Sequence, residues 1–167
     1  MASIRRRGDT WQARIVQKGF TPITKSFPSR ELAELWAKKT EVDMARGAFI
    51  DTQLAERTTL GEVFKRYTLE VSPLHRGQKH EVARLSLLGR DKVATIALAN
   101  LTPQDIADLR DRRLQRIKES TCNREMQLVS AVISHACREW GMHLPRGNPC
   151  ALVRKPPPGL GRRRLFE

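Results

Sequence analysis

The single tyrosine of the chain, Tyr67, is a candidate catalytic residue because of its phenol group. A tyrosine phenol can attack a phosphodiester when neighbouring cations hold the phosphate charge. Tyr67 also continues a series, Leu60, Val63 and Phe64, whose spacing is typical of the buried face of an amphipathic helix. Because this periodicity already accounts for Tyr67, we expect the residue to pack and not to act as a nucleophile.

Histidine and cysteine side chains gather late in the chain, at His135, Cys137, His143 and Cys150. These residue types can bind zinc, but His135 and Cys137 lie two positions apart on a predicted helix and therefore face different directions. The chain has three cysteines and no Cys-x-x-Cys pair, which argues against a disulfide framework and suits a reducing cytoplasm. We expect ordinary packing at these positions, with no metal site, no cofactor and no catalytic residue.

Lysine and arginine outnumber the acidic residues. The 167 residues include 31 Lys and Arg against 18 Asp and Glu, a net charge of +13. This charge favours a polyanionic partner, because each cation placed on a nucleic-acid phosphate releases a condensed counterion. A basic protein without a ligand is the alternative. Residues 1–7 contain no apolar segment typical of a signal peptide, and no stretch has the ~18 apolar residues of a membrane span.

The first 27 residues alternate polar and apolar side chains in the manner of strands. The predicted strands are residues 3–7, 10–16 and 23–27, with turns at residues 8–9 and 18–22. Trp11, Ala13 and Ile15 share one face of the second strand. We expect one helix to cover this face, while the opposite face of an antiparallel sheet stays open.

A helix is predicted after these strands. Ser29 has the residue type of an N-cap, and Gly47 suits the position after the last helical turn. Leu32, Leu35 and Trp36 have the spacing of a buried helix face. The expected core of this unit consists of Trp11, Ile15, Phe27 and Trp36.

Four amphipathic helices are predicted beyond a linker of mixed polarity at residues 48–57. Residues 59–62 have the capping-box pattern and open the first helix, which ends before Ser72-Pro73. The second helix spans residues 78–88, and the third begins at Pro103 and runs to about Lys118. The fourth carries a wide apolar stripe that ends at Gly141. The predicted fold class is α+β: a three-stranded antiparallel sheet with one helix, followed by an all-α four-helix domain.

Five segments occur in the order found in one protein family. They are residues 8–14 (GDTWQAR), 26–37 (SFPSRELAELWA), 58–62 (TTLGE), 101–106 (LTPQDI) and 121–125 (TCNRE). Together they resemble the DNA-binding half of a phage-type tyrosine recombinase, or integrase. The resemblance implies an arm-type DNA-binding domain like the AP2 fold at 1–49, a linker at 50–57, a helical core-binding (SAM-like) domain at 58–155, and a basic linker toward a catalytic domain at 156–167.

The family's catalytic groups have no counterpart in this chain. Tyrosine recombinases cut DNA with a tyrosine nucleophile that two arginines, a lysine and histidines of a C-terminal domain assist. We therefore expect a chain without enzymatic activity that binds double-stranded DNA and has a full-length recombinase as a further partner. The resemblance also implies a monomer in the absence of DNA, no membrane contact and a place in the bacterial cytoplasm at the nucleoid.

Two other functions fit the same charge balance. A truncated DNA-binding competitor could occupy recombination sites and block a complete recombinase. An RNA-binding protein would also be basic, but the chain has no RNP-like or KH-like motif and only one tyrosine to stack on bases. Inhibition of a full-length enzyme would identify the first alternative, and a preference for structured RNA over duplex DNA the second.

The predicted DNA contacts fall into two groups. In the sheet unit, outward side chains are expected to enter a groove: Arg5, Arg7, Gln12, Arg14, Lys18 and Lys25. In the helical domain, the second helix is expected to contribute Lys79, His80 and Arg84. The basic run of the third helix contributes Arg113 and Lys118, and the start of the fourth helix contributes Thr121, Asn123 and Arg124. For each of these residues the alternative is a solvated surface side chain without a ligand. Thr121 could also simply cap its helix, and Arg124 could pair with a carboxylate. Residues 162–164, all arginine, would add non-specific affinity.

Overall fold

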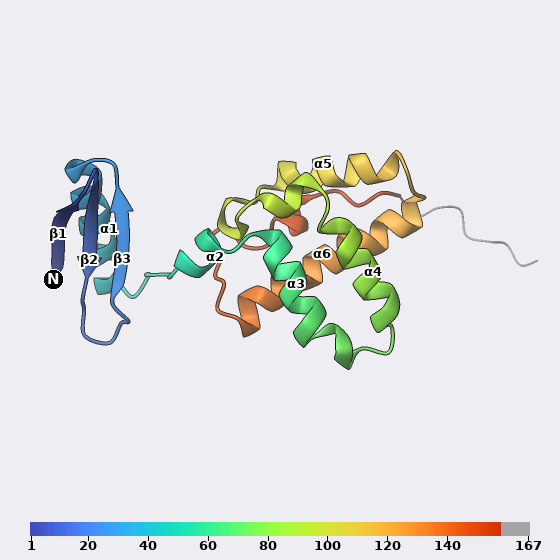
Figure 1. The fold of residues 1–167 in the computed structure, drawn as a ribbon, viewed down its shortest axis with the longest axis horizontal. Helices are drawn as coiled ribbons and strands as arrows, with labels where there is room; N and C mark the ends of the chain where they lie inside the picture. The colour runs from blue at the N-terminus through green and yellow to red at the C-terminus, as the bar shows by residue number, and fades with distance from the viewer. Residues whose placement is uncertain (158–167) are drawn as a thin grey trace, which may run out of the picture. The chain divides into compact units, whose positions relative to one another are not determined.

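A computed structural model describes residues 1–157, so the arginines at 162–164 lie outside the described residues. The chain divides into two compact units, Met1–Ile50 and a second unit that begins at Asp51 (Figure 1). The first unit combines a sheet with a helix and the second is helical. The predicted α+β fold class is confirmed.

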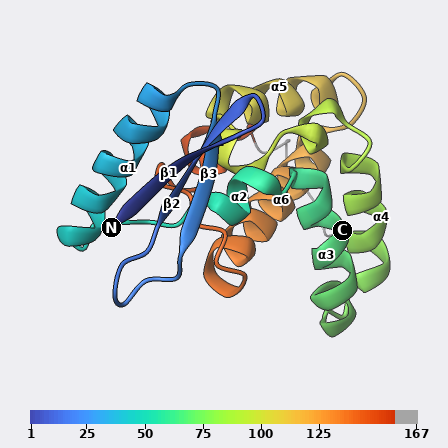
Figure 2. The same cartoon turned by 60° about the vertical axis from the view of Figure 1, so that its left-hand side comes forward.

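The first unit is a three-stranded antiparallel sheet with a helix along one face (Figure 2). The strands are β1 (Ala2–Arg7), β2 (Thr10–Ile15) and β3 (Ile23–Phe27), and β2 is the central strand. The helix α1 (Arg30–Ala45) begins as predicted, because the Ser29 hydroxyl accepts a hydrogen bond from the Leu32 N–H. It ends before Gly47, whose φ of 67° is a left-handed conformation that favours glycine.

The core of the first unit differs from the predicted one. The sheet buries Ala13, Ile15 and Ile23, and α1 buries Ala33, Ala37, Thr40 and Met44. Leu32 and Leu35, which were expected to face inward, are 47% and 66% exposed. The residues of α1 that face the sheet thus include Ala33 and Ala37 and not Leu32 and Leu35, so α1 is rotated relative to the predicted orientation.

The large aromatic residues lie at the margin of this core. Trp11, Phe27 and Trp36 are half-buried, so only Ile15 of the predicted core is fully enclosed. The rings of Phe27 and Trp36 pack against each other with centroids 5.5 Å apart. These aromatic rings thus lie at the margin of the buried core and not at its centre.

The second unit is built from helices and short 3₁₀ turns. Its elements are α2 (Gln53–Arg57), α3 (Leu60–Glu70), η1 (Ser72–Leu74), α4 (Gln78–Leu88), η2 (Lys92–Thr95), η3 (Leu98–Asn100), α5 (Pro103–Leu114), α6 (Glu119–Glu139) and η4 (Pro149–Leu152). The predicted linker is partly wrong, because its last five residues form the helix α2. The third predicted helix is too long, since α5 ends at Leu114 and not near Lys118. No helix among residues 1–157 is long and apolar enough to cross a membrane.

Local signals fix the starts of α3 and α5. The Thr59 hydroxyl accepts from the Glu62 N–H, and the Glu62 carboxylate accepts from the Thr59 N–H at 2.7 Å. Thr102 and Asp105 make the same reciprocal pair at the start of α5. Such capping boxes satisfy N–H groups that the helix itself leaves without partners.

One apolar core holds the helices of the second unit together. The predicted buried face of α3 is confirmed, because Leu60, Val63, Phe64 and Tyr67 are each at most 5% exposed. They pack with Leu85 and Leu88 of α4, Ile106 and Leu109 of α5, and Val129, Val132 and Ile133 of α6. The long helix α6 crosses behind α3 and α4 in Figure 1, and α5 also packs against it.

Candidate nucleic-acid interface

The face of the sheet opposite α1, called here the outer face, carries polar and basic side chains. The strand register decides its members, because residues directly opposite each other in antiparallel strands point to the same side. Ser3 pairs with Arg14, Arg5 with Gln12, and Arg7 with Thr10 across β1 and β2. Gln12 and Arg14 pair with Ser26 and Thr24 of β3. Ala13 and Ile15, which alternate with these positions, are buried against α1.

Four of the six predicted sheet contacts lie on the outer face. Arg5, Arg7, Gln12 and Arg14 are there, and Lys18 is exposed in the β2–β3 turn. The prediction that Lys25 faces outward is wrong. Lys25 pairs with Ala13, so its side chain starts from the face that α1 covers. The hydroxyls of Ser3, Thr10, Thr24 and Ser26 were missed, although their positions alternate in step with Arg5 and Gln12.

Acidic residues are absent from the outer face. The first unit has acidic side chains at Asp9 in the β1–β2 turn and at Glu31, Glu34, Glu41 and Asp43 on α1. Glu34 accepts a hydrogen bond from Arg30 at 2.8 Å within α1. Among the paired strand residues, the three arginines of the outer face therefore share their side of the sheet with no carboxylate. This arrangement presents hydrogen-bond donors and positive charge toward a polyanion.

Two polar side chains of the outer face are joined to each other. Arg5 donates from Nε and Nη2 to Gln12 Oε1, at 3.1 and 3.0 Å. Nearby, the Thr10 hydroxyl donates to the Arg7 carbonyl at 3.1 Å and stabilises the end of the hairpin. Gln12 is half-buried on the central strand, whereas Arg5 is exposed on β1. The pair thus sits in the middle of the face, with Arg7 and Arg14 at neighbouring positions.

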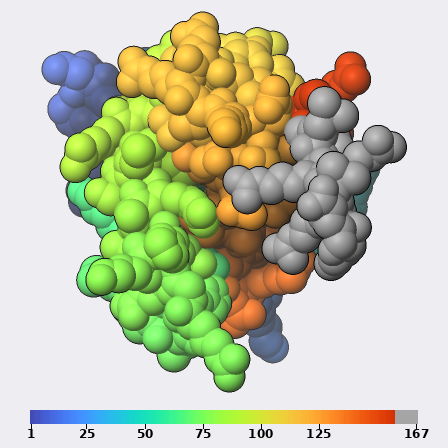
Figure 3. Space-filling model, turned by 90° about the vertical axis from the view of Figure 1, so that its right-hand side faces the viewer, coloured from blue at the N-terminus to red at the C-terminus, as the bar shows by residue number. Residues whose placement is uncertain are grey.

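The predicted residues of α4 lie at the surface of the second unit. Lys79 and His80 are exposed, and Arg84 is half-buried. Figure 3 shows the light-green atoms of this region beside the yellow-orange atoms of the turn between α5 and α6, on one face. This face therefore brings together the two segments that were expected to contact DNA in the helical unit.

Arg113 has a different role from the predicted one. Its guanidinium donates two hydrogen bonds to the Glu125 carboxylate, at 2.7 and 2.8 Å, and the two side chains are 13% and 3% exposed. The hydrogen bonds from Arg113 to Glu125 raise the pKa of the guanidinium further above its ordinary value. Arg113 is thus held inside the unit and joins α5 to α6.

The start of α6 also differs from the prediction. Thr121 does not cap the helix, because α6 begins at Glu119 and Lys118 occupies the N-cap position. Lys118 and Arg124 are exposed, and Thr121 is half-buried. The amide group of Asn123 is engaged within the protein, since its Nδ2 donates to the Pro156 carbonyl at 3.0 Å. Its buried Oδ1 has no hydrogen-bond partner among residues 1–157.

Other arginines of α5 are paired as well, which the sequence pattern did not indicate. Arg112 donates to the Asp91 carboxylate at 2.6 and 3.1 Å and so fixes α5 to η2. Burial would raise the pKa of Asp91, but the hydrogen bonds from Arg112 and from the Val93 N–H outweigh it and lower the pKa below its ordinary value. Arg110 donates to Asp111 and to the Arg154 carbonyl, both within 2.8 Å.

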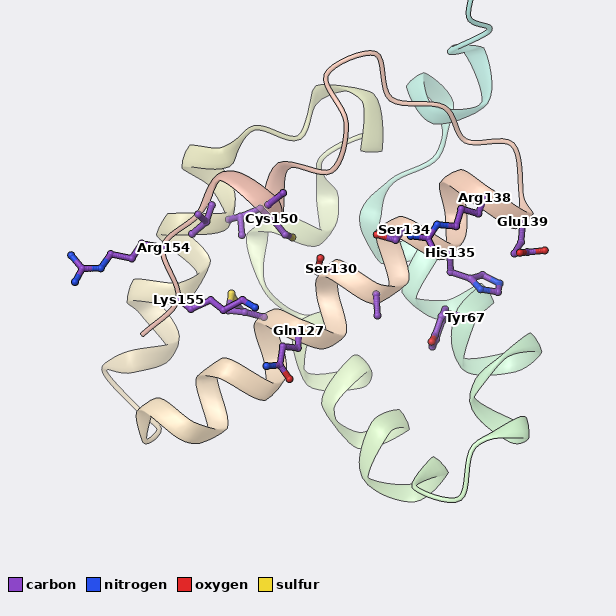
Figure 4. Close-up of a pocket in the computed structure, with 15 residues that line it drawn as sticks. Tyr67, Gln127, Ser130, Ser134, His135, Arg138, Glu139, Cys150, Arg154 and Lys155 are labelled. Carbon is purple, nitrogen blue, oxygen red and sulfur yellow. The ribbon is translucent and has the colours of Figure 1, made fainter. Parts of the chain in front are cut away.

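A groove of about 590 Å³ runs along α6 (Figure 4). Its walls include Ser130 and Ser134 on the helix, and Arg154 and Lys155 on the segment after η4. Both serine hydroxyls accept from Asn148 Nδ2, at 3.2 and 2.9 Å. These hydroxyls serve to hold the segment that leads into η4.

Tyr67 lies in an aromatic cluster at one end of this groove. Its ring packs edge-on against His135 and Trp140, with centroids 5.4 and 6.5 Å away, and Arg66 lies 4.3 Å from the centre of the Trp140 ring. Burial and the negative charge of Glu81 raise the pKa of the Tyr67 phenol. Both effects disfavour the phenolate that a nucleophile needs.

The cysteines and histidines form no metal site within residues 1–157. Cys122, Cys137 and Cys150 are free. Burial raises the pKa of Cys150 to about 12, so this thiol stays protonated and unreactive near neutral pH.

Comparison with known proteins finds relatives along the chain. Two Haemophilus influenzae proteins named "Putative integrase/recombinase" are 28% identical over 169 residues and 31% identical over 84 residues. These alignments cover 100% and 50% of this chain, and 44% and 28% of the relatives. A shufflon-specific DNA recombinase of Escherichia coli is 32% identical over 116 residues, 65% of this chain and 30% of the relative. The chain thus spans less than half the length of these relatives. No family model matches it, and no solved structure matches it significantly.

Proposed function

Because the chain is a tyrosine recombinase-like protein, we propose that it serves site-specific DNA recombination by binding double-stranded DNA as the non-catalytic half of an integrase. The outer face of the sheet carries this proposal. It combines Arg5, Arg7 and Arg14 with amide and hydroxyl groups and holds no acidic residue. Cations that no carboxylate neutralises can bind phosphates, and donors and acceptors of this kind read base edges in the major groove.

The two units have separate roles in this proposal. The first unit binds an arm-type site with the outer face of its sheet, and the second unit grips the recombination site itself. In the second unit the proposed contacts are the exposed or half-exposed residues Lys79, His80, Arg84, Lys118, Thr121 and Arg124. Arg113 and Asn123 are left out of this set because the fold already engages their donor groups.

Residues 1–157 are proposed to hold DNA and not to cut it. Their one tyrosine, Tyr67, is 5% exposed and has a raised pKa. A phenol in that environment cannot align with a phosphate without leaving the core. The purified chain should therefore leave supercoiled plasmid intact, and accumulation of nicked or rejoined DNA would contradict this part of the proposal.

The experiment that tests DNA binding is a titration of a fluorescent duplex library at two salt concentrations, followed by sequencing of the bound fraction. We expect affinity to fall steeply with salt, because counterions return to each phosphate that the protein releases. The double variant Arg7→Ala/Arg14→Ala should lower the slope of log affinity against log salt by about 1.8, on the basis of about 0.9 per phosphate contact.

A matched control removes the same charge from the other side of the unit. Lys38 and Lys39 are exposed on α1, and Lys38→Ala/Lys39→Ala also changes the net charge by two. This variant should retain most of the slope. Equal losses in both double variants would mean that net charge alone drives binding, and no binding of any duplex at low salt would overturn the proposed function.

A further inference from the structure

The Arg5–Gln12 pair on the outer face limits what Gln12 can offer to a ligand. Arginine carries only donors, so the glutamine oxygen must be the atom that faces Arg5. Both the Nε and Nη2 groups of Arg5 donate to that oxygen, at 3.1 and 3.0 Å. The Gln12 Nε2 group therefore points away from Arg5 as a donor, and the usual acceptor of the side chain is already occupied.

Together the two side chains present donors only. Gln12 offers the two hydrogens of Nε2, and Arg5 keeps its Nη1 hydrogens because only Nε and Nη2 bond to Gln12. Neither residue presents a free acceptor of comparable strength on this face. The surface between β1 and β2 thus matches a ligand edge that consists of two acceptors.

Guanine and adenine differ in the number of hydrogen-bond acceptors that they present in the major groove. In the major groove guanine shows two acceptors, N7 and O6, whereas adenine shows one acceptor, N7, beside the N6 amino donor. A free glutamine reads adenine by donating to N7 and accepting from N6. Gln12 cannot do this while Arg5 holds its oxygen, because the adenine amino group would meet another donor.

We infer that Arg5 and Gln12 act as one specificity-determining element that selects guanine over adenine in the major groove of duplex DNA. This inference rests on the proposed function and deepens it, since it names the base that the sheet reads. Arg5 is a positioning residue for Gln12 as well as a contact. Arg7 and Arg14, at adjacent positions of the same face, bind the flanking phosphates.

The position of the pair in the fold supports a reading role. Gln12 is half-buried on the central strand, and its backbone is held by pairing with Arg5 on one side and Ser26 on the other. The major groove admits a two-stranded antiparallel ribbon, and the β1–β2 hairpin that carries the pair is such a ribbon within the three-stranded sheet. The side chains at the centre of such a ribbon reach the base edges, while those toward its ends lie near the backbone.

The test is selection from a randomised duplex library by the full chain and by three variants. Gln12→Ala identifies the base position that Gln12 reads, because the preference there should flatten. The wild type should prefer guanine over adenine at that position by about tenfold, the lower range for one good bidentate contact. Arg5→Ala frees the Gln12 oxygen and should turn the preference toward adenine.

Arg7→Ala is the matched control for Arg5→Ala. It removes the same side chain from the same strand and face, so it should weaken binding without changing the base preference. A guanine preference that survives Arg5→Ala, or a wild-type preference for adenine, would overturn the inference and leave the proposed DNA binding intact. The same holds for binding without any consensus, which would place the pair on phosphates. No duplex binding at low salt would instead overturn the proposed function, and the inference with it.

Discussion

The outer face of the sheet and the helix α5 are both rich in arginine, yet their arginines have different partners. On the outer face, Arg5, Arg7 and Arg14 share a surface without carboxylates. On α5 each arginine reaches a carboxylate of the protein: Arg110 pairs with Asp111, Arg112 with Asp91, and Arg113 with Glu125. The presence of a carboxylate within reach, and not the density of positive charge, separates the two surfaces.

This difference suggests two roles for the arginines: the α5 set stabilises the fold, and the outer-face set is proposed to bind an anion. The α5 arginines join elements of the second unit, since Asp91 precedes η2 and Glu125 belongs to α6. The arginines of the outer face pair with no carboxylate of the strands, and we propose that they meet an external anion. Substitutions should therefore separate folding from binding: the α5 set should affect stability, and the outer-face set should affect affinity.

The largest effect is expected at Arg113. Arg113→Met leaves the Glu125 carboxylate 3% exposed and without its guanidinium. Removing one partner of a buried ion pair typically costs about 3–5 kcal/mol, because the remaining charge stays desolvated. The free energy of unfolding should fall by this amount in chemical denaturation followed by far-UV circular dichroism, which reports mainly the helices.

A double variant separates the lost pair from a general packing defect. In Arg113→Met/Glu125→Leu no charge remains buried, and most of the stability should return. The outer-face variant Arg14→Ala should change the unfolding free energy by only about 0.5 kcal/mol or less, as surface substitutions do. A loss at Arg14 as large as that at Arg113 would remove the distinction between the two surfaces.

A second, smaller effect is a pH dependence at Asp91. The folded state lowers the pKa of this carboxyl, so its contribution to stability is present above the unfolded pKa of about 3.9 and is lost as pH falls through the folded value. Asp91→Asn keeps the shape but removes the charge. Wild type should exceed Asp91→Asn in unfolding free energy by about 1.5–3 kcal/mol at pH 7, the range of hydrogen bonds to charged groups.

The difference between the two proteins should shrink as the pH is lowered below 4. Taking the difference at each pH cancels the titration of the other carboxylates, which both proteins share. Asp9→Asn, in the exposed β1–β2 turn, provides a control for the change in net charge. A wild-type advantage over Asp91→Asn that stays constant down to pH 2 would contradict the role of the ion pair.

The parts of the fold that were predictable from the sequence depend on local rules. Strand alternation located the three strands, the capping-box pattern at Thr59 located the start of α3, and Pro103 at the first helical position located the start of α5. The same alternation placed Arg5, Gln12 and Arg14 on the open face. Each of these signals acts within a few residues, where covalent geometry limits the alternatives.

The parts that were not predictable depend on partners far away in sequence. Arg113 and Glu125 are 12 residues apart, and Arg112 and Asp91 are 21 apart, so no local pattern shows that they meet. On α1 the buried positions are Ala33 and Ala37 and not Leu32 and Leu35, and a count of apolar spacing cannot tell which apolar residues the sheet covers. The placement of the basic side chains was therefore predicted less well in the second unit than in the sheet.

The smallest expected effect is that of removing a single arginine on the salt dependence of DNA binding, compared between the outer face and α5. Arg7→Ala should lower the slope of log affinity against log salt by about 0.9, which amounts to roughly tenfold in affinity at 0.1 M salt. Arg112→Ala removes the same charge from α5 but should leave the slope unchanged, because its guanidinium is bound to Asp91 at 2.6 Å and not to phosphate. Fluorescence anisotropy across a salt series, at a temperature where both variants are folded, measures both slopes. A slope reduced equally by Arg112→Ala would mean that DNA competes successfully with Asp91, and the partition of arginines into those that hold the fold and those that hold DNA would then fail.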